Sequence, residues 1–168
     1  MNARVEQLIS SLQLQPHPEG GYYREVYRSS EKIQKGHLPP RFSGDCAIST
    51  SIYYLLGEND FSAFHRIRSD EIWHFYDGGT LLIYIVDADG TLKIEKLGRN
   101  SANDEQYQVI VPAMSWFAAI PEKNSGFVLA GCTVAPGFNF SDFEMAIFDN
   151  LVGKYPSHYS LFRKLCRK

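Results

Sequence analysis

Short runs rich in apolar residues follow one another along the middle of this chain, a pattern typical of β-strands. Turn residues such as Asp77-Gly78-Gly79 separate the runs. In chain order, the runs of strand length are AISTSIYYLL, FSAFHRI, EIWHFY, LLIYIV, LKIEKL, YQVIVP, SWFAAI and GFVLAGCTV. Because no helical pattern lies between them, we expect an antiparallel sandwich or barrel and not a parallel sheet with crossover helices.

The two ends of the chain carry helical patterns. Apolar residues recur at helical spacing at Val5, Leu8, Ile9 and Leu12. This spacing predicts a short amphipathic helix over residues 3–12 that packs on the outside of the barrel. Residues 149–168 are predicted to form a closing helical segment. Residues 31–45 contain glycine and proline without a clear period, so we expect a loop there, the best candidate for a flexible flap.

Composition limits the classes of protein to which this chain can belong. With 168 residues, 44% of them apolar and 14% aromatic, residues 1–168 are expected to form one domain. The chain has 17 basic and 19 acidic residues and a net charge of -2. We therefore expect no nucleic-acid partner and no binding to membrane surfaces.

Cysteine usage and the lack of long apolar segments predict where the protein resides. Cys46, Cys132 and Cys166 form no CxxC pair, and their odd number argues against a disulfide framework. No stretch resembles a signal peptide or approaches the roughly 18 apolar residues of a membrane span. These observations favour a reducing compartment, and we expect a cytoplasmic protein.

The segment HRIRSDEIWHFYDG, residues 65–78, contains the candidate chemistry. Period-two alternation places His65 on one face of its strand and Glu71 on one face of the next. If both face the barrel interior, an imidazole and a carboxyl with a raised pKa can act as base and acid. A structural reading, in which the pair only holds the barrel together, remains open. His74 is out of phase with Glu71 and is expected to point away.

The spacing of this segment resembles the first metal motif of cupin β-barrels, G-x5-H-x-H-x3-E-x6-G. The second motif, P-x-G-x2-H, is matched only in part by VPAMSWF. The four metal-ligand positions are occupied by His65, Ile67, Glu71 and Phe117. Because two ligands seldom hold a transition metal, we expect no bound cofactor. The alternative is a divalent metal held by His65, Glu71 and His74.

Aromatic residues are concentrated in the strands expected to line the interior. As ligand-binding residues we predict Tyr23, Arg24, Tyr53, Trp73, Phe75 and Trp116. The rings would form a wall for stacking a sugar or base, with Arg24 or Arg66 pairing an anionic group. Ordinary core packing explains many of the same aromatic positions. The chain lacks a glycine-rich phosphate loop and the GxSxG motif, which argues against nucleotide hydrolysis and acyl-enzyme chemistry.

Several segments together closely resemble the small single-domain cupin family long catalogued as a domain of unknown function. They are HPEGGYYREVYRS, STSIYYLL, FSAFHRIRSDEIWHFYDG, VPAMSWFAA and GCTVAPGFNFSDFEMA. The resemblance implies an all-β jelly-roll (double-stranded β-helix) cupin barrel, a homodimer, and a polar and aromatic cavity without an assigned reaction.

Residue by residue, the resemblance implies three groups of positions. The first, around the barrel mouth, contains Glu19, Gly20, Gly21, Tyr23 and Arg24. The second, within or beside the barrel, contains His65, Glu71, Trp73 and Trp116. The third, which secures the last strand, contains Asp142, Phe143 and Glu144. The chain departs from the family at Met114, where glycine is usual, and at Phe117, where a polar residue is common. We expect Met114 to narrow the pocket.

These observations lead to three hypotheses for the function. The first is a metal-independent cupin that binds a small polar metabolite, such as a sugar or nucleotide derivative. Its chemistry would be epimerisation or isomerisation through His65 and Glu71, by analogy with deoxysugar-nucleotide epimerases of the same fold. The second is a metal-dependent oxygenase or isomerase. The third is a non-catalytic sensor or binding module, so the sequence leaves open whether the protein is an enzyme.

Overall fold

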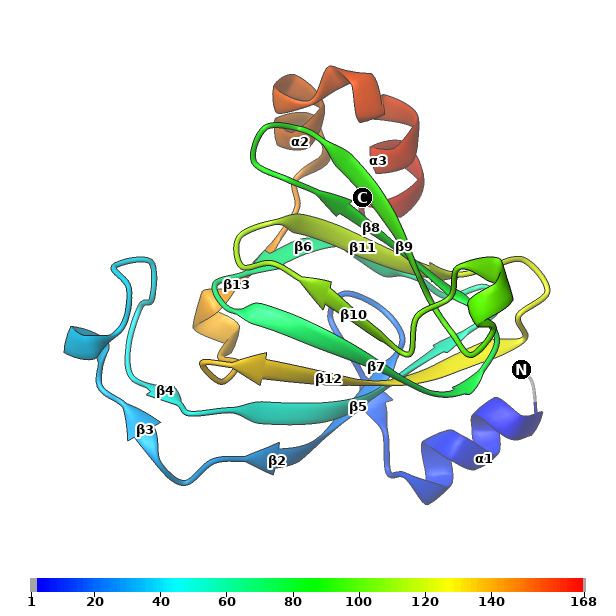
Figure 1. Cartoon of the computed structure of the whole chain (residues 1–168), viewed down its shortest axis with the longest axis horizontal. Coiled ribbons are helices and arrows are strands. Elements are labelled where there is room, and N and C mark those ends of the chain that lie inside the picture. The colour runs from blue at the N-terminus through cyan, green and yellow to red at the C-terminus, as the bar shows by residue number, and fades with distance from the viewer. Residues whose placement is uncertain (1–2, 168) are drawn as a thin grey trace.

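Two antiparallel sheets curl around a shared interior in the computed structural model, which describes residues 3–167 (Figure 1). The strand order is β1-β2-β5-β12-β7-β10 in the six-stranded sheet and β13-β6-β11-β8-β9 in the five-stranded sheet. This arrangement is a jelly roll, as the sequence predicted. The strands of the six-stranded sheet are β1 (Gln15–Pro16), β2 (Tyr22–Arg28), β5 (Thr50–Gly57), β7 (Asp70–Gly78), β10 (Gln108–Val111) and β12 (Phe127–Ala135). The strands of the five-stranded sheet are β6 (Ser62–Ile67), β8 (Leu81–Val86), β9 (Leu92–Leu97), β11 (Trp116–Pro121) and β13 (Phe143–Met145).

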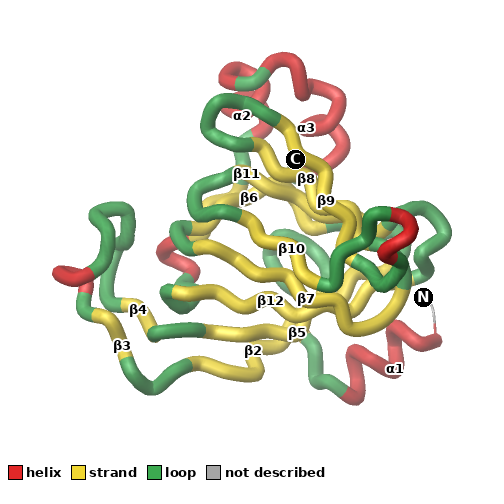
Figure 2. Tube along the Cα trace, viewed as in Figure 1, coloured by secondary structure: helices red, strands yellow, loops and turns green. Residues whose placement is uncertain are grey.

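Helices cover the outside of the barrel at two places (Figure 2). The α-helices are α1 (Ala3–Ser11), α2 (Phe148–Lys154) and α3 (Tyr159–Leu165). Short 3-10 turns are η1 (Lys35–His37), η2 (Ser101–Asn103), η3 (Phe140–Asp142) and η4 (Pro156–His158). Helix α1 buries Val5 and Leu8 against Leu55 and Leu129, on the outer face of the six-stranded sheet. This contact confirms the predicted N-terminal amphipathic helix.

The closing segment is also helical, as predicted. Helices α2 and α3 pack on the outer face of the five-stranded sheet (Figure 1). The rings of Phe162 and Phe64 meet edge to face with their centroids 5.1 Å apart. Because both rings are fully buried, they form the centre of a second core outside the barrel.

The predicted loop over residues 31–45 carries a short ladder of its own. Strands β3 (Lys32–Ile33) and β4 (Cys46–Ala47) pair in an arm that projects beyond the barrel (Figure 1). The base of this arm is fixed by Ser43, whose hydroxyl donates to Asp142 Oδ1 at 2.7 Å. Movement of the arm as a flap stays a prediction.

Strand register divides the barrel interior into a polar end and an apolar end. Thr50 pairs with Val134, and Val134 also pairs with Glu71, which places these three residues at one end. Four residues further along β5 and β7, Tyr54 and Phe75 both pair with Ala130 and belong to the apolar core. The cavity therefore lies at the end of the barrel where β5 and β7 begin and β12 ends.

Two further observations concern the predicted location. All three cysteines are buried and free. None of the helices within residues 3–167 has the length and apolar character that crossing a membrane requires. The cytoplasmic location stays a prediction.

Candidate functional site

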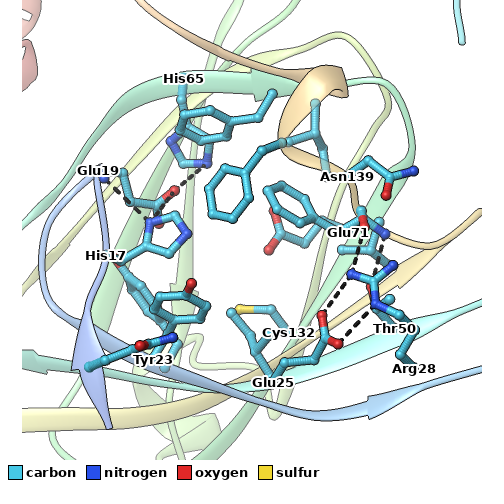
Figure 3. Close-up of a pocket in the computed structure, with 18 residues that line it drawn as sticks. His17, Glu19, Tyr23, Glu25, Arg28, Thr50, His65, Glu71, Cys132 and Asn139 are labelled. Carbon is cyan, nitrogen blue, oxygen red and sulfur yellow. Dashed lines mark hydrogen bonds and ion pairs between the residues drawn. The ribbon is translucent and has the colours of Figure 1, made fainter. Parts of the chain in front are cut away.

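The polar end of the barrel encloses a cavity of about 330 Å³ (Figure 3). Its walls come from strands of both sheets and from the segment after β12. The lining residues are Gln15, His17, Glu19, Tyr23, Glu25, Arg28, Thr50, Ile52, Tyr54, His65, Ile67, Glu71, Cys132, Val134, Phe138, Asn139, Phe140 and Phe143. The cavity therefore combines aromatic walls with convergent ionisable groups, the usual composition of a small-molecule site.

His65 hydrogen bonds through both of its ring nitrogens. Nδ1 lies 2.7 Å from the carbonyl oxygen of Ala63, which only accepts, so Nδ1 carries a proton. Nε2 lies 3.1 Å from Glu19 Oε2, and the other carboxylate oxygen accepts from Ser62 Oγ at 2.9 Å. Because His65 and Glu19 are both buried, the contact needs a proton between Nε2 and Oε2. His65 thus has no nitrogen left for a ligand.

His17 is the second imidazole against Glu19. Its Nδ1 accepts from the backbone N–H of Glu19 at 3.3 Å, which leaves the proton of the neutral ring on Nε2. Burial is the main cause that lowers the pKa of His17, so the ring is neutral at pH 7. Within residues 3–167 no group hydrogen bonds to Nε2, and this nitrogen points into the cavity (Figure 3).

A turn of two glycines places Glu19 in the wall. Gly20 and Gly21 have φ angles of 123° and 66°, in the region that favours glycine. A Cβ atom at Gly21 would lie 2.6 Å from the carbonyl oxygen of Leu55. The hydroxyl of Tyr54 donates to the Gly20 carbonyl at 2.7 Å and fixes the turn from inside the barrel. Glycine is therefore required in this turn by the backbone geometry and, at Gly21, by the close approach of β5.

Glu71 lies on another wall of the cavity and is protonated at neutral pH. Burial, and then the charge of Glu19, raise the pKa of Glu71 from 4.5 to about 8. Its neighbour Cys132 is also buried, and burial raises the pKa of this thiol well above its usual value. A carboxyl with this pKa donates a hydrogen bond at pH 7, and a small fraction of it accepts a proton.

The remaining charges of the cavity form one ion pair on the side opposite His17 (Figure 3). Arg28 Nε and Nη2 donate to Glu25 Oε1 and Oε2 at 2.9 and 2.7 Å. Nη2 also donates to the carbonyl of Phe138 at 2.9 Å. The pair is about 40% exposed, at 39% for Arg28 and 38% for Glu25, so it lies toward the mouth of the cavity.

The structure brings only some of the predicted site residues together. His65 and Glu71, the predicted catalytic pair, both line the cavity, and so does Tyr23. Trp73 and Phe75 point into the barrel but belong to the apolar core at its other end. They lie two and four residues after Glu71 on the same face of β7. The prediction included them because the sequence does not specify how deep the cavity extends.

Three other predicted ligand-binding residues face away from the interior, contrary to the prediction. The guanidinium of Arg24 donates to the Leu12 carbonyl at 3.0 Å, beneath α1. Tyr53 packs in the α1 cluster, because Tyr54 takes the inward position on β5. Trp116 packs under α2 and α3, since its neighbour Phe117 pairs with His65 and faces inward.

Arg66, the other arginine proposed to bind an anion, also lies outside the barrel. Its Nε donates to Glu144 Oε2 at 2.8 Å, and its guanidinium lies 4.5 Å from the centroid of the Trp116 ring. Alternation along β6 explains this position, because His65 and Ile67 occupy the inward face. Arg28 is the arginine that reaches the cavity.

The donor set of a cupin metal centre is incomplete. Ile67 lines the cavity, and the Phe117 ring lies against the His65 ring with centroids 4.1 Å apart. His74 lies on the outer face, where Nε2 is 3.0 Å from Thr133 Oγ1. His65, Glu71 and His74 therefore form no common site. Across residues 3–167, no group of three or more His, Cys, Asp or Glu side chains is placed to hold a metal ion.

Met114 does not narrow the cavity, contrary to the expectation from sequence. It is the third residue of the turn that Ser115 N–H closes on the Pro112 carbonyl at 3.2 Å. Its φ of 68° explains why glycine suits this position, and its side chain is 38% exposed. The methionine thus affects the turn and not the cavity.

A jelly roll whose barrel encloses His65 and Glu71 at the motif spacing defines this protein as a cupin. Residues 6–146 match the family described as Cupin superfamily (DUF985), and the chain belongs to that family. An uncharacterized protein of Saccharomyces cerevisiae, YML079W, is 32% identical over 148 residues, which cover 82% of this chain and 73% of the yeast protein.

Solved structures show the same fold. Protein SO0799 from Shewanella oneidensis is 36% identical with a TM-score of 0.87, over 99% of this chain and 98% of that one. A hypothetical protein from Leishmania major is 29% identical with a TM-score of 0.88, over 97% and 98% of the two chains. Oxalate decarboxylase from Bacillus subtilis, at 14% identity and a TM-score of 0.54 over 89% of this chain and 36% of that one, shares the fold alone.

Proposed function

We propose that this cupin binds a small polar metabolite in the barrel cavity and catalyses a proton transfer on it, as an isomerase or epimerase. The observation that carries the proposal is the presence of two neutral hydrogen-bond donors in the wall of one cavity. These are the protonated carboxyl of Glu71 and the Nε2–H of His17. Neither group belongs to the ion pairs of the site, and the contacts of the Glu71 carboxyl with Cys132 and Trp73 leave its own proton for a ligand.

Glu71 is the acid and base of this proposal. A catalytic group works best when its pKa lies near the working pH, and the pKa of Glu71 is raised to about 8. In its ionised form Glu71 takes a proton from a carbon next to a carbonyl group. For isomerisation of a hydroxy-carbonyl compound, the hydroxyl proton on that carbon passes to the former carbonyl oxygen within the enolate, and the carboxyl delivers its proton to the former carbonyl carbon. For epimerisation, the enolate turns its other face to the carboxyl before the proton returns to the carbon it came from. Neither outcome needs an oxidant.

His17 stabilises the charge that develops on the carbonyl oxygen. When the C–H bond breaks, its electron pair moves toward the carbonyl and forms an enolate. The Nε2–H of a neutral imidazole donates a hydrogen bond to that oxygen without transferring its proton. Low dielectric in the enclosed cavity strengthens this bond.

His65 acts through other residues in this scheme, which revises the role expected from sequence. Because both of its nitrogens are bonded, it holds Glu19, and Glu19 holds His17 through its backbone N–H. We therefore assign His65 and Glu19 as positioning residues. Glu71 keeps the catalytic role that the sequence suggested.

The test is deuterium exchange, which requires no knowledge of the product. The protein is incubated in D2O with a panel of small hydroxy-carbonyl metabolites, and deuterium at carbon is detected by proton NMR and mass spectrometry. We expect exchange with the parent protein and at least a hundredfold slower exchange with Glu71→Gln. A compound that binds in the cavity without exchange would contradict catalysis and support the non-catalytic binding module.

A further inference from the structure

We infer that the ligand of this cavity is an uncharged polyhydroxylated compound of the size of a single sugar, and not a carboxylate or a phosphate ester. This inference rests on the proposed function, because it takes the barrel cavity as the ligand site. It follows from the charge balance of the lining residues and from the size and aromatic character of the walls.

The first charged pair is neutral as a unit. His65 carries a proton on Nδ1, and one further proton lies between its Nε2 and Glu19 Oε2 at 3.1 Å. Whether that proton stays on the imidazole or on the carboxyl, the two groups together have no net charge. Ser62 and the Ala63 carbonyl occupy the other polar atoms of the pair, so it offers no free charge to a ligand.

The second charged pair is also neutral as a unit. Two nitrogens of Arg28 contact the two carboxylate oxygens of Glu25 at 2.9 and 2.7 Å, and one also contacts the Phe138 carbonyl. Within the described residues lining the cavity, Arg28 is the only Lys or Arg. A ligand anion would have to displace Glu25 from this bidentate contact or lie beside its negative charge.

The other titratable groups add no charge at pH 7. Burial keeps Glu71 protonated and His17 neutral. Every charge in the lining is therefore compensated within the protein. A charged ligand would enter a largely apolar cavity without a free counter-ion, which is unfavourable.

The remaining lining residues suit hydroxyl groups and the C–H faces of a sugar ring. Neutral polar side chains come from Gln15, Thr50 and Asn139, and aromatic side chains from Tyr23, Phe138, Phe140 and Phe143. The volume of about 330 Å³ is near the lower end of ligand pockets, which span about 300–1,000 Å³. One sugar fits this volume better than an intact sugar nucleotide.

The test compares pairs of probes that differ in charge and share a carbon skeleton. Aldoses and ketoses of three to six carbons are each measured beside the corresponding aldonate and sugar phosphate, by saturation-transfer NMR and titration calorimetry at pH 7. We expect at least one neutral sugar to bind at least tenfold more tightly than its charged partners. Tighter binding of an aldonate or phosphate, or binding by no neutral sugar, would overturn the inference.

Charge variants at the mouth provide the matched controls. Glu25→Gln leaves Arg28 without its carboxylate partner, so we expect the ratio of aldonate affinity to neutral-sugar affinity to rise at least tenfold. Arg28→Gln should bind aldonates more weakly than the parent protein does. The double variant should restore the parent's preference for neutral sugars over aldonates. An unchanged ratio in Glu25→Gln would contradict the assigned charge balance.

The outcome also separates this inference from the proposed function. If a charged metabolite binds and exchanges deuterium at carbon, proton transfer stands and the ligand class is wrong. If a neutral sugar binds without exchange, the ligand class stands and catalysis is wrong.

Discussion

Glu19 Oε2 lies 3.1 Å from His65 Nε2, so the turn after β1 is joined to the centre of β6 by a buried contact. The carboxyl also lies 3.4 Å from His17 Nδ1. One acidic residue thus contacts two imidazoles in the wall of the cavity, His65 through its carboxyl and His17 through its backbone N–H. Because the contact is buried, the stability of the fold and the geometry of the site depend on the same atoms.

This relationship predicts strong energetic coupling between Glu19 and His65. Removing one member of a buried pair typically costs about 3–5 kcal/mol, because the other is left buried without a partner. We therefore expect His65→Gln to lower the free energy of unfolding by about 3 kcal/mol. The double variant His65→Gln, Glu19→Gln should lose less stability than the sum of the single variants, by about 1 kcal/mol or more. Urea unfolding measures all three.

An exposed pair provides the matched control. Arg66 Nη2 lies 2.7 Å from Glu144 Oε2, with the side chains 29% and 55% exposed. Solvent-exposed pairs contribute about 0–1 kcal/mol, so Glu144→Gln should cost less than about 1 kcal/mol. Equal losses for Glu144→Gln and His65→Gln would contradict the importance of burial.

The raised pKa of Glu71 predicts that this residue makes the protein less stable as the pH rises. Unfolded chains release this proton near pH 4.5, whereas the folded protein keeps it to about pH 8. Between these values the folded state binds more protons than the unfolded chain. The stabilising contribution of Glu71 is therefore complete below pH 4.5 and decreases as the pH rises to about 8. One proton corresponds to a slope of at most about 1.4 kcal/mol per pH unit.

Glu71→Gln removes this slope. We expect the free energy of unfolding of the variant, relative to that of the parent, to rise from pH 5 to pH 8 and to level off above pH 8. The raised pKa of about 8 sets this upper limit. Urea unfolding at one-unit pH steps tests this. Glu58→Gln, at an exposed position, serves as the control. A pH-independent difference for Glu71→Gln would show that the carboxyl is ionised in the folded protein.

The turn that carries Glu19 predicts a third result. Gly21 has a φ of 66°, and an added Cβ would lie 2.6 Å from the Leu55 carbonyl and 2.7 Å from Leu56 Cδ2. Gly21→Ala should therefore lower the free energy of unfolding by about 2 kcal/mol or more. Gly36→Ala, where nothing lies within 4 Å of the added atom, should change it by no more than about 0.5 kcal/mol. Comparable losses at both positions would contradict the requirement for glycine in the turn.

The fold could be predicted from sequence because its signals are repeated. The succession of strand-length apolar runs and the turn residues between them indicate one antiparallel barrel, and the motif segments agree with it. His65 and Glu71 were found for the same reason, since both lie within regular strands where period two fixes the facing side. The helix near Val5 and Leu8 follows from an equally regular period.

Where two adjacent aromatic residues share a strand, alternation alone does not say which one faces inward. Tyr53 was predicted to bind ligand, but Tyr54 faces the interior. On β2 a register shift between Glu25 and Tyr27 changes the phase, which brings Arg28 into the cavity while Arg24 faces out. Register and bulges depend on the neighbouring strand, so they are not encoded in the strand itself.

His17 was missed as a member of the site, and Glu19 was placed at the barrel mouth only through the family resemblance, for a different reason. They lie in a turn with positive φ angles, where no strand period applies. The segment HPEGG did contain a signal, because paired glycines indicate a backbone that approaches another element closely. Its contact with His65 is long-range, and only the closed barrel reveals it.

Met114 gives the last prediction, that replacing it with the glycine usual in the family stabilises the protein. Its φ of 68° costs an L-residue about 1–2 kcal/mol. Glycine removes that cost but raises the entropy of the unfolded chain by about 0.5–1 kcal/mol. Since the side chain is 38% exposed, little packing is lost, and Met114→Gly should raise the free energy of unfolding by about 0.5–1 kcal/mol. Ala113 is the control, because it has no positive φ, and Ala113→Gly should lower the free energy of unfolding by a similar amount. Equal losses in both variants would contradict strain at Met114.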